Sequence, residues 1–268
     1  METIGFYTPY KHLPEFKNLV EAKFNCIELT GPVPDSVDYL FCAPNYAKFV
    51  LTDKHLVNTK VKAILTPSTG TNHLDVSCVP VYDISRSKIL KEIYSTAEHN
   101  LYLCLQIVRK VPPILELRDC TLGIMGYGRL GKMLKRMTKN IFKEVLTMDL
   151  NYIDEGFFEK TDMLSININL TPDNEDIVGK DFISQFKKDI FIINTSRGEV
   201  VNELEIIQQI NLGKVKGYAT DVIKNEHSPT KSFLTIIDHP RILITPHVGG
   251  TALSAQEKAY KEVLQNIL

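Results

Sequence analysis

Residues 121–131 of the chain are TLGIMGYGRLG, an apolar run that leads into three glycines. Thr121 to Met125 predicts a buried strand, and the residues after the glycines predict a helix. In such a unit Gly126 permits a tight turn, Gly128 lets a ligand approach the backbone, and Gly131 lets the helix pack on the strand. The exposed N–H groups and the positive helix end would bind a diphosphate. The alternative interpretation is a glycine-rich turn without a ligand.

The next predicted strand, Val145 to Leu150, has an acidic residue near its end. Asp149 follows Gly131 by 18 residues, close to where a ribose-binding carboxylate is expected in a dinucleotide-binding unit. A carboxylate there favours NAD, because it would repel the 2′-phosphate of NADP. The alternative is an ordinary polar residue at the end of a strand. The glycines and Asp149 together predict an NAD-binding domain.

Apolar strands alternate with helices along the rest of the chain, which is typical of an α/β fold with a doubly wound parallel sheet. The further predicted strands are Met163–Ile168, Ile190–Thr195, Gly217–Val222 and Ile242–Thr245, and the helices are Lys132–Lys139, Lys180–Lys187 and Glu203–Leu212. The first 90 residues predict a second, smaller α/β unit with strands at Ile4–Tyr7, Cys26–Leu29, Tyr39–Cys42 and Lys62–Leu65. A long helix, Ser95–Lys110, would connect the units, and a helical tail, Ala255–Leu268, would return to the first.

The composition narrows the class of protein. Of 268 residues, 44% are apolar and 24% are charged, with a formal net charge of -1, so we expect no nucleic-acid or membrane partner recognised by bulk charge. Met1 to Lys11 has no signal-peptide pattern, and the most apolar window, Leu101 to Val108, is too short to span a bilayer. Five cysteines without a C-x-x-C pair indicate reduced thiols in a cytoplasmic protein, and no metal site is predicted.

Three polar segments follow later predicted strands, NTSRG at 194–198, TDVIKNE at 220–226 and TPHVGG at 245–250. Ligands of open α/β sheets bind at this carboxyl edge. The guanidinium of Arg197 can bind the carboxylate and carbonyl oxygens of a 2-keto acid through paired hydrogen bonds. Reduction of the carbonyl also needs a proton donor, and an imidazole paired with a carboxylate, His247 with Glu226, can supply one. The alternatives are a solvated arginine, a surface acid and a structural histidine.

These segments resemble the D-isomer-specific 2-hydroxyacid dehydrogenase family over most of residues 60–255. The resemblance includes STGTNHLD at 68–75, TAEH at 96–99, the GYGRLG turn with Asp149, and the three polar segments. It implies two Rossmann-like domains, in which an NAD-binding domain at 94–252 is inserted into a discontinuous substrate domain at 1–93 and 253–268. It also implies a homodimer joined through the NAD-binding domains.

The resemblance implies roles for individual residues. Arg197 would bind the substrate carboxylate and polarise its carbonyl, His247 would be the general acid or base, and Glu226 would keep His247 protonated. The backbone at Thr69 and Gly70 would hold the carboxylate, and Asp221 would contact the nicotinamide carboxamide. The other cofactor-lining positions would be Arg129, Leu130, Ile168, Asn169, Thr195, Ser196 and Gly249, beside Thr69, the three glycines, Asp149 and His247.

Several points stay open in the sequence. Gly70 to Asn72 (GTN) is similar to bacterial phosphoglycerate dehydrogenases, yet residues 41–46 lack an arginine for a phosphate. Phosphoglycerate, hydroxypyruvate, glyoxylate and longer 2-keto acids therefore remain alternatives. Asn167 and Asn169 stand where the family often has His and Pro, and the region after Leu150 is abbreviated. A non-catalytic NAD-sensing scaffold and a bare nucleotide-binding domain are the competing functions.

Overall fold

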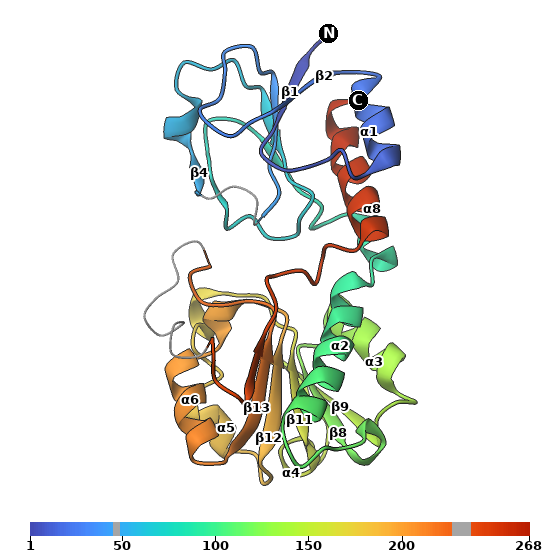
Figure 1. The fold of residues 1–268 in the computed structure, drawn as a ribbon, viewed down its shortest axis with the longest axis vertical. Helices are drawn as coiled ribbons and strands as arrows, with labels where there is room; N and C mark the ends of the chain where they lie inside the picture. Colours follow the sequence, from blue (N-terminus) through green and yellow to red (C-terminus); the bar gives the residue numbers. More distant parts are fainter. Residues whose placement is uncertain (45–48, 227–236) are drawn as a thin grey trace. The chain divides into compact units, whose positions relative to one another are not determined.

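The computed structural model describes residues 1–44, 49–226 and 237–268. The chain divides into two compact units (Figure 1). The first unit is Met1–Ile93 with Thr251–Leu268, and the second unit is Tyr94–Gly250. Each unit has its own parallel sheet covered by helices, which confirms the predicted fold class. The end of the segment 41–46, which was considered for a substrate phosphate, lies outside the described residues, as do residues 47 and 48.

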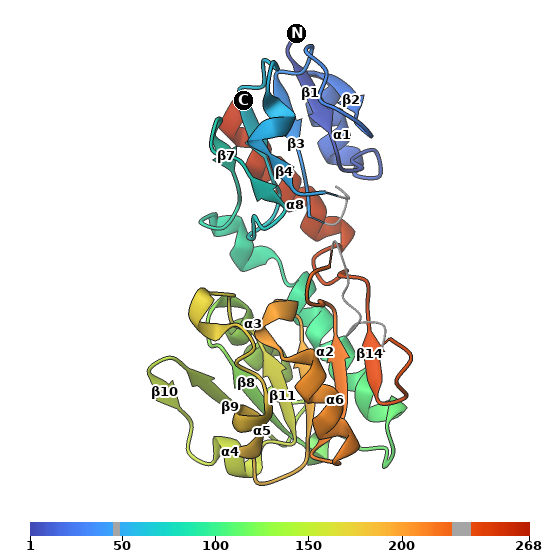
Figure 2. The ribbon, with the colours of Figure 1, turned by 90° about the vertical axis from the view of Figure 1, so that its left-hand side faces the viewer.

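The second unit contains a seven-stranded sheet in the order β10-β9-β8-β11-β12-β13-β14. The chain runs from β8 to β9 on one side and then crosses to β11 on the other, so a topological switch point lies between β8 and β11. Among the described strands of this sheet, β10 alone is antiparallel to its neighbour, and it folds back at the edge (Figure 2). The strands are β8 Thr121–Met125, β9 Glu144–Asp149, β10 Tyr152–Ile153, β11 Met163–Ile166, β12 Ile190–Asn194, β13 Val215–Thr220 and β14 Ile242–Ile244.

Helices cover both faces of this sheet, and the two-residue repeat of the strands explains how (Figure 1). In β12, Phe191 and Ile193 pack with α2 in one apolar cluster, whereas Ile190 and Ile192 pack with α5 and α6 in another. Both faces are therefore buried, as a parallel sheet requires. The helices are α2 Ser95–Lys110, α3 Arg129–Thr138, α4 Phe157–Lys160, α5 Lys180–Ser184 and α6 Glu203–Asn211.

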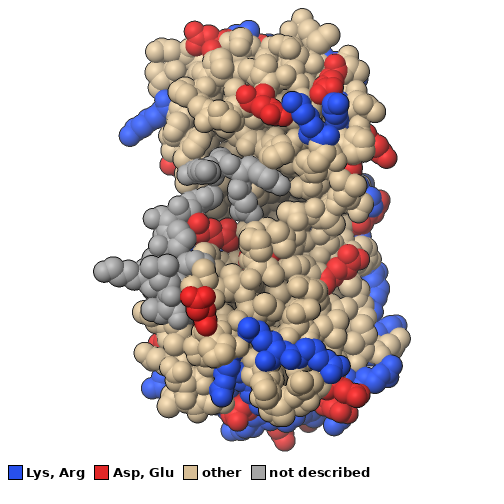
Figure 3. All heavy atoms as spheres, viewed as in Figure 1, with Lys and Arg blue, Asp and Glu red and all other residues tan. Residues whose placement is uncertain are grey.

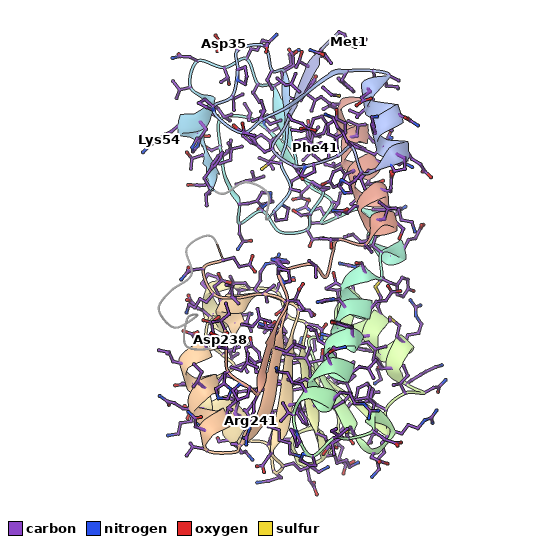
Figure 4. All side chains as sticks on the ribbon, in the orientation of Figure 1. Met1, Asp35, Phe41, Lys54, Asp238 and Arg241 are labelled. Carbon is purple, nitrogen blue, oxygen red and sulfur yellow. The ribbon has the colours of Figure 1, made fainter. Side chains whose placement is uncertain are left out.

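The first unit contains a five-stranded parallel sheet in the order β2-β1-β3-β5-β7. Its strands are β1 Thr3–Phe6, β2 Asn25–Glu28, β3 Tyr39–Phe41, β5 Ala63–Leu65 and β7 Val81–Tyr82, and the pair β4 Leu51–Thr52 and β6 Leu74–Asp75 lies apart. Helices α1 Pro14–Glu21 and α8 Leu253–Leu264 pack together on one face, where Phe41 joins their core (Figures 1 and 4). The carboxylate of Glu257 on α8 accepts hydrogen bonds from the backbone N–H groups of Glu15 and Phe16, which fixes the first turn of α1.

Most predicted elements occur within one or two residues of their expected bounds. Helix α2 has the predicted bounds, whereas the predicted tail helix is α8 followed by a short 3₁₀ helix. The patterns missed α1, α4, β4, β6, β7 and β10, which are short elements. The 3₁₀ helices are η1 Asp53–Leu56, η2 Lys88–Glu92, η3 Leu117–Asp119, η4 Pro172–Asn174, η5 Gly198–Val200 and η6 Gln265–Ile267.

Candidate active site

The glycine turn after β8 has the geometry of a diphosphate cradle. Gly126 has φ +93°, and a Cβ there would lie 2.7 Å from the carbonyl oxygen of Asn167. A Cβ at Gly131 would lie 2.1 Å from the carbonyl oxygen of Gly126, so the helix packs too closely on the turn for any side chain. Gly128, in contrast, is the N-cap of α3 and has nothing within 4 Å of its Cβ position. Among the described residues no side chain caps this helix, and the start of a helix beside the open side of Gly128 fits a diphosphate.

Asp149 is the last residue of β9 and lies against the glycine turn. Its Oδ2 accepts a hydrogen bond of 2.9 Å from the backbone N–H of Tyr127, and its Oδ1 accepts one of 2.8 Å from Leu150 N–H. The carboxylate is half-exposed, and its oxygens have further lone pairs for a ribose hydroxyl. The position of Asp149 and its acceptor oxygens therefore fit the ribose hydroxyls at the adenosine end of NAD.

Residues after β11, β12 and β14 complete this edge of the sheet. The side chain of Ile168 lies 2.8 Å from the Cβ position of Gly126, so the loops after β8 and β11 meet at the switch point. Thr195 is buried and its hydroxyl accepts a hydrogen bond from the side chain of Asn100 on α2. Burial lowers the pKa of Arg129. The other predicted cofactor-lining residues of the second unit lie in the same loops or at the start of α3, and they are Leu130, Asn169, Ser196 and Gly249.

Arg197 lies in the loop between β12 and η5. Asn194 orders this loop, because its amide donates to the Arg197 carbonyl and its Oδ1 accepts from both the N–H and the hydroxyl of Ser196. The guanidinium is half-buried and donates to the Ser196 carbonyl at 2.7 Å. Within the described residues it forms no ion pair with a carboxylate. A positive charge held in this way can bind the carboxylate of a small ligand.

Gly198 fixes the Arg197 loop to the segment that contains Glu226. A Cβ at Gly198 would lie 2.0 Å from the carbonyl carbon of Ile223, so the two backbones are in direct contact. Glu203 is buried at the start of α6 and accepts a hydrogen bond of 2.9 Å from Lys224 N–H. Burial raises the pKa of Glu203. These contacts set the distance between the arginine loop and the Glu226 segment.

His247 and Glu226 form a hydrogen-bonded pair. The imidazole Nδ1 lies 2.8 Å from Glu226 Oε2, and the two side chains are 29% and 26% exposed. His247 has φ +54°, a left-handed backbone conformation that a residue with a side chain rarely adopts. Such strain persists only where the surroundings enforce it, and it occurs often at functional sites. Both residues follow strands at the carboxyl edge, whereas Arg241, labelled in Figure 4, lies at the opposite end of β14.

Asp221 is buried directly after β13 and accepts several hydrogen bonds. Its Oδ1 accepts from the Thr245 hydroxyl at 2.5 Å and from Val248 N–H at 2.9 Å, and its Oδ2 accepts from Gly249 N–H at 2.7 Å. His99 Nε2 lies 3.1 Å from Oδ1. Burial alone would raise the pKa of Asp221, but these hydrogen bonds outweigh it and lower the pKa. Asp221 therefore remains ionised, and its carboxylate oxygens bind groups of the protein itself.

Two polar residues of α2 belong to this site, although neither was expected to have a role in it: His99, which ends the TAEH segment, and Asn100. His99 contacts Asp221 and Thr245, and Asn100 is fully buried between Thr195 and Ser165. The sequence offers no signal for these contacts, because Ser95, Thr96 and Glu98 make the whole first part of α2 polar. Thr69 and Gly70 lie in the first unit, in the loop after β5, where the Ser68 hydroxyl donates to the Gly70 carbonyl at 2.6 Å.

Outside this site, the charge distribution, the helices and the possible metal ligands point to no further function. On the face drawn in Figure 3, acidic and basic side chains are interspersed over each unit. The described residues contain no helix long and apolar enough to cross a membrane. They also contain no cluster of His, Cys, Asp and Glu that could hold a metal ion.

The fold and the site define a Rossmann-type oxidoreductase that uses a nicotinamide dinucleotide. Residues 88–249 match the family model of the D-isomer specific 2-hydroxyacid dehydrogenase, NAD binding domain. The chain belongs to this family, and the predictions of family, NAD as cofactor and an oxidoreductase acting on CH–OH groups are confirmed.

Curated relatives and solved structures agree with the family. The chain is 25% identical over 235 residues to the glycerate dehydrogenase of Methylorubrum extorquens, covering 77% of this chain and 75% of that protein. It is 23% identical to an aromatic 2-oxoacid reductase of Clostridium sporogenes, in an alignment that covers 100% of this chain and 95% of that protein. The pyruvate reductase of Chlamydomonas reinhardtii superposes with a TM-score of 0.83 at 18% identity, covering 100% of this chain and 95% of that chain. The D-lactate dehydrogenase of Aquifex aeolicus, complexed with NAD and lactic acid, superposes with a TM-score of 0.77 at 20% identity, covering 99% of this chain and 94% of that chain.

Proposed function

We propose that this protein is an NAD-dependent D-2-hydroxyacid dehydrogenase that interconverts a small 2-keto acid and its D-2-hydroxy acid. The observation that carries the proposal is the bond between His247 Nδ1 and Glu226 Oε2, in the same unit as an arginine loop and a diphosphate cradle. This combination provides a proton donor, a cation and a cofactor site. The names of the relatives, which include glycerate dehydrogenase and aromatic 2-oxoacid reductase, support the substrate class.

Arg197 binds the substrate in this proposal. Its guanidinium forms paired hydrogen bonds with the carboxylate and draws electron density from the adjacent carbonyl oxygen. Its lack of a carboxylate partner among the described residues supports this role. Bound NADH supplies the hydride to the 2-carbon, and NAD accepts it in the reverse direction.

His247 transfers the proton in this proposal. In reduction its imidazolium donates a proton to the carbonyl oxygen, and in oxidation the neutral ring accepts the hydroxyl proton. Nδ1 is bonded to Glu226, so we assign the transferred proton to Nε2. Glu226 orients the ring and stabilises its protonated form.

The two units divide the work of binding. We assign the cofactor to the second unit, where Asp149 binds the adenosine ribose and the glycine turn binds the diphosphate. Thr69 and Gly70 of the first unit bind the substrate carboxylate through their backbone, so the first unit with its returning α8 is the substrate domain. The family resemblance of these segments supports the assignment.

We also propose a cytoplasmic homodimer. The five cysteines are free, which suits a reducing compartment. Tyr102 and Leu105 expose 45% and 42% of their surface on one face of α2, which suits a contact between NAD-binding domains. Light scattering of the wild type and of Leu105→Glu tests the dimer, and an equal mass of one chain for both proteins would contradict it.

Turnover of a panel of 2-keto acids tests the proposed activity. The panel contains hydroxypyruvate, glyoxylate, pyruvate, phenylpyruvate and phosphohydroxypyruvate, each with NADH, and the loss of NADH absorbance is followed. We expect at least one acid to be reduced, and we expect Arg197→Ala to weaken substrate binding and turnover together. NADH binding without turnover of any 2-keto acid would contradict the proposal and favour an NAD-sensing scaffold.

A further inference from the structure

The backbone around His247 is held on both sides by one carboxylate. On the N-terminal side the Thr245 hydroxyl donates to Asp221 Oδ1 at 2.5 Å. On the C-terminal side the N–H groups of Val248 and Gly249 donate to Oδ1 and Oδ2 at 2.9 and 2.7 Å. His247 itself has φ +54° and its N–H donates to the Thr245 carbonyl. Hydrogen bonds to Asp221 therefore hold the chain on both sides of the strained residue. We call Asp221 with its three donors, Thr245, Val248 and Gly249, the Asp221 clamp.

The first turns of α2 hold the Asp221 clamp in place. His99 Nε2 lies 3.1 Å from Asp221 Oδ1 and 2.9 Å from the Thr245 hydroxyl oxygen, and the His99 side chain is only 14% exposed. Because the Thr245 hydroxyl donates to Asp221, we assign a proton to His99 Nε2, which donates to the Thr245 hydroxyl oxygen and lies within ion-pair distance of Asp221 Oδ1. One turn earlier, the Ser95 hydroxyl donates to the Gly249 carbonyl at 2.6 Å. One face of α2 therefore contacts both ends of the segment that contains His247.

The space around Gly249 leaves little freedom for the segment. A Cβ at Gly249 would lie 2.9 Å from Asp221 Oδ2 and 3.5 Å from His99 Cδ2. The His99 ring also packs against the Tyr102 ring, with centroids 5.4 Å apart. If the His99 donor is removed, Thr245 loses a hydrogen bond and Asp221 Oδ1 loses a polar contact at 3.1 Å, so the left-handed backbone at His247 loses part of its support.

We propose that His99 is a positioning residue that acts through Asp221 and Thr245 to hold His247 in the orientation from which it transfers a proton. His99 does not touch the reacting atoms in this account. The proposal rests on the proposed function of His247. The family resemblance assigns Asp221 a contact with the nicotinamide carboxamide. The proposal adds that Asp221, held by His99, fixes the backbone around His247.

Three variants test the proposal. His99→Ala removes the donor, His99→Gln keeps an N–H near the position of Nε2, and Glu98→Gln changes an exposed neighbour on the same helix as a matched control. We expect His99→Ala to lower kcat about 10- to 100-fold, the range expected when a reacting group is misplaced by about 1 Å. KM for NADH should stay within about twofold, because the glycine turn is unchanged. His99→Gln should recover most of the turnover, and Glu98→Gln should match the wild type.

Amide hydrogen exchange gives a readout that does not depend on activity. In the protein without substrate, His99→Ala should accelerate exchange at Val248 and Gly249 but not at Tyr127, whose N–H is bound to Asp149. Unchanged exchange at Val248 and Gly249 would overturn the proposal, as would equal losses of turnover in His99→Ala and His99→Gln. If the wild type reduces no 2-keto acid, the proposed function fails while the exchange data still decide whether His99 holds the segment.

Discussion

Individual side chains at the edge of the second sheet are placed by contacts that differ in kind. Glu226 binds His247 directly through its carboxylate, whereas Asn194 orders the Arg197 loop from below through three hydrogen bonds. Asp149 binds the backbone of the glycine turn. Each residue can therefore be changed with a specific consequence.

Replacement of His247 by alanine tests the proton donor. We expect kcat to fall about 10²- to 10⁴-fold, since this is the usual contribution of general acid–base catalysis. The dissociation constant of NADH, measured by fluorescence, should change little because the diphosphate cradle is intact. Near-normal turnover would show that another group donates the proton.

Replacement of Asp149 by asparagine tests cofactor choice while the hydrogen bond to the glycine turn is kept. The amide oxygen of asparagine can still accept from Tyr127 N–H, whereas the bond from Leu150 N–H is lost together with the negative charge. We expect the preference for NADH over NADPH, taken as the ratio of kcat/KM values, to fall about tenfold, or roughly 1.4 kcal/mol. An unchanged ratio would be evidence against a role of Asp149 at the ribose.

Asp221 links the stability of the second unit to pH. Its folded pKa is lowered, so its carboxylate stabilises the protein fully above the unfolded-state pKa of about 3.9 and loses this effect as the pH falls through the folded value. The difference in melting temperature between the wild type and Asp221→Asn should therefore be largest above about pH 4 and shrink below it. Melting curves at several pH values measure this difference, and a difference that grows on acidification would contradict the assigned ionisation.

At the scale of elements, the cofactor edge depends on how turns and helices meet. Gly131 and Gly198 allow backbone contacts that no side chain would permit, whereas Gly128 faces open space. The space at each Cβ position therefore distinguishes Gly131 and Gly198, which close backbone packing requires, from Gly128, which leaves room for a ligand.

Gly128→Ala tests this separation. The added methyl group has no neighbour within 4 Å among the described residues, so the variant should melt within a few degrees of the wild type. It should bind NADH about tenfold or more weakly, because the methyl group occupies the path of the diphosphate. Gly31→Ala, which also faces open space but lies in the first unit, is the control and should bind NADH normally. Normal NADH binding by Gly128→Ala would refute the cradle.

The sequence predicted long elements better than short ones for a physical reason. Helix α2 spans 16 residues, enough for a clear apolar periodicity and for the two prolines after it to mark its end. Strand β10 has two residues and depends on pairing with β9, and α1 begins at Pro14 in a short segment. The contacts of His99 and Asn100 were not predicted, because a tertiary hydrogen bond leaves no trace in local spacing.

In the molecule as a whole, the two units contain different features: the second contains the residues of the candidate site, and the first contains both ends of the chain. The second unit contains the described residues that form the cradle, the arginine loop and the His247–Glu226 pair. The first unit joins the two ends of the chain, because α8 packs on α1 through Glu257. A mutation in α8 should therefore act on the stability of the first unit.

In the proposed reaction the 2-carbon of a keto acid receives hydride from NADH while His247 protonates the carbonyl oxygen. The direct measurement uses NADH deuterated at C4 with the best acid of the panel, followed by mass spectrometry and chiral chromatography of the product. We expect a 2-hydroxy acid of D configuration with deuterium on C2, formed by the wild type and scarcely by His247→Ala. A product of L configuration, or one without deuterium on C2, would contradict it.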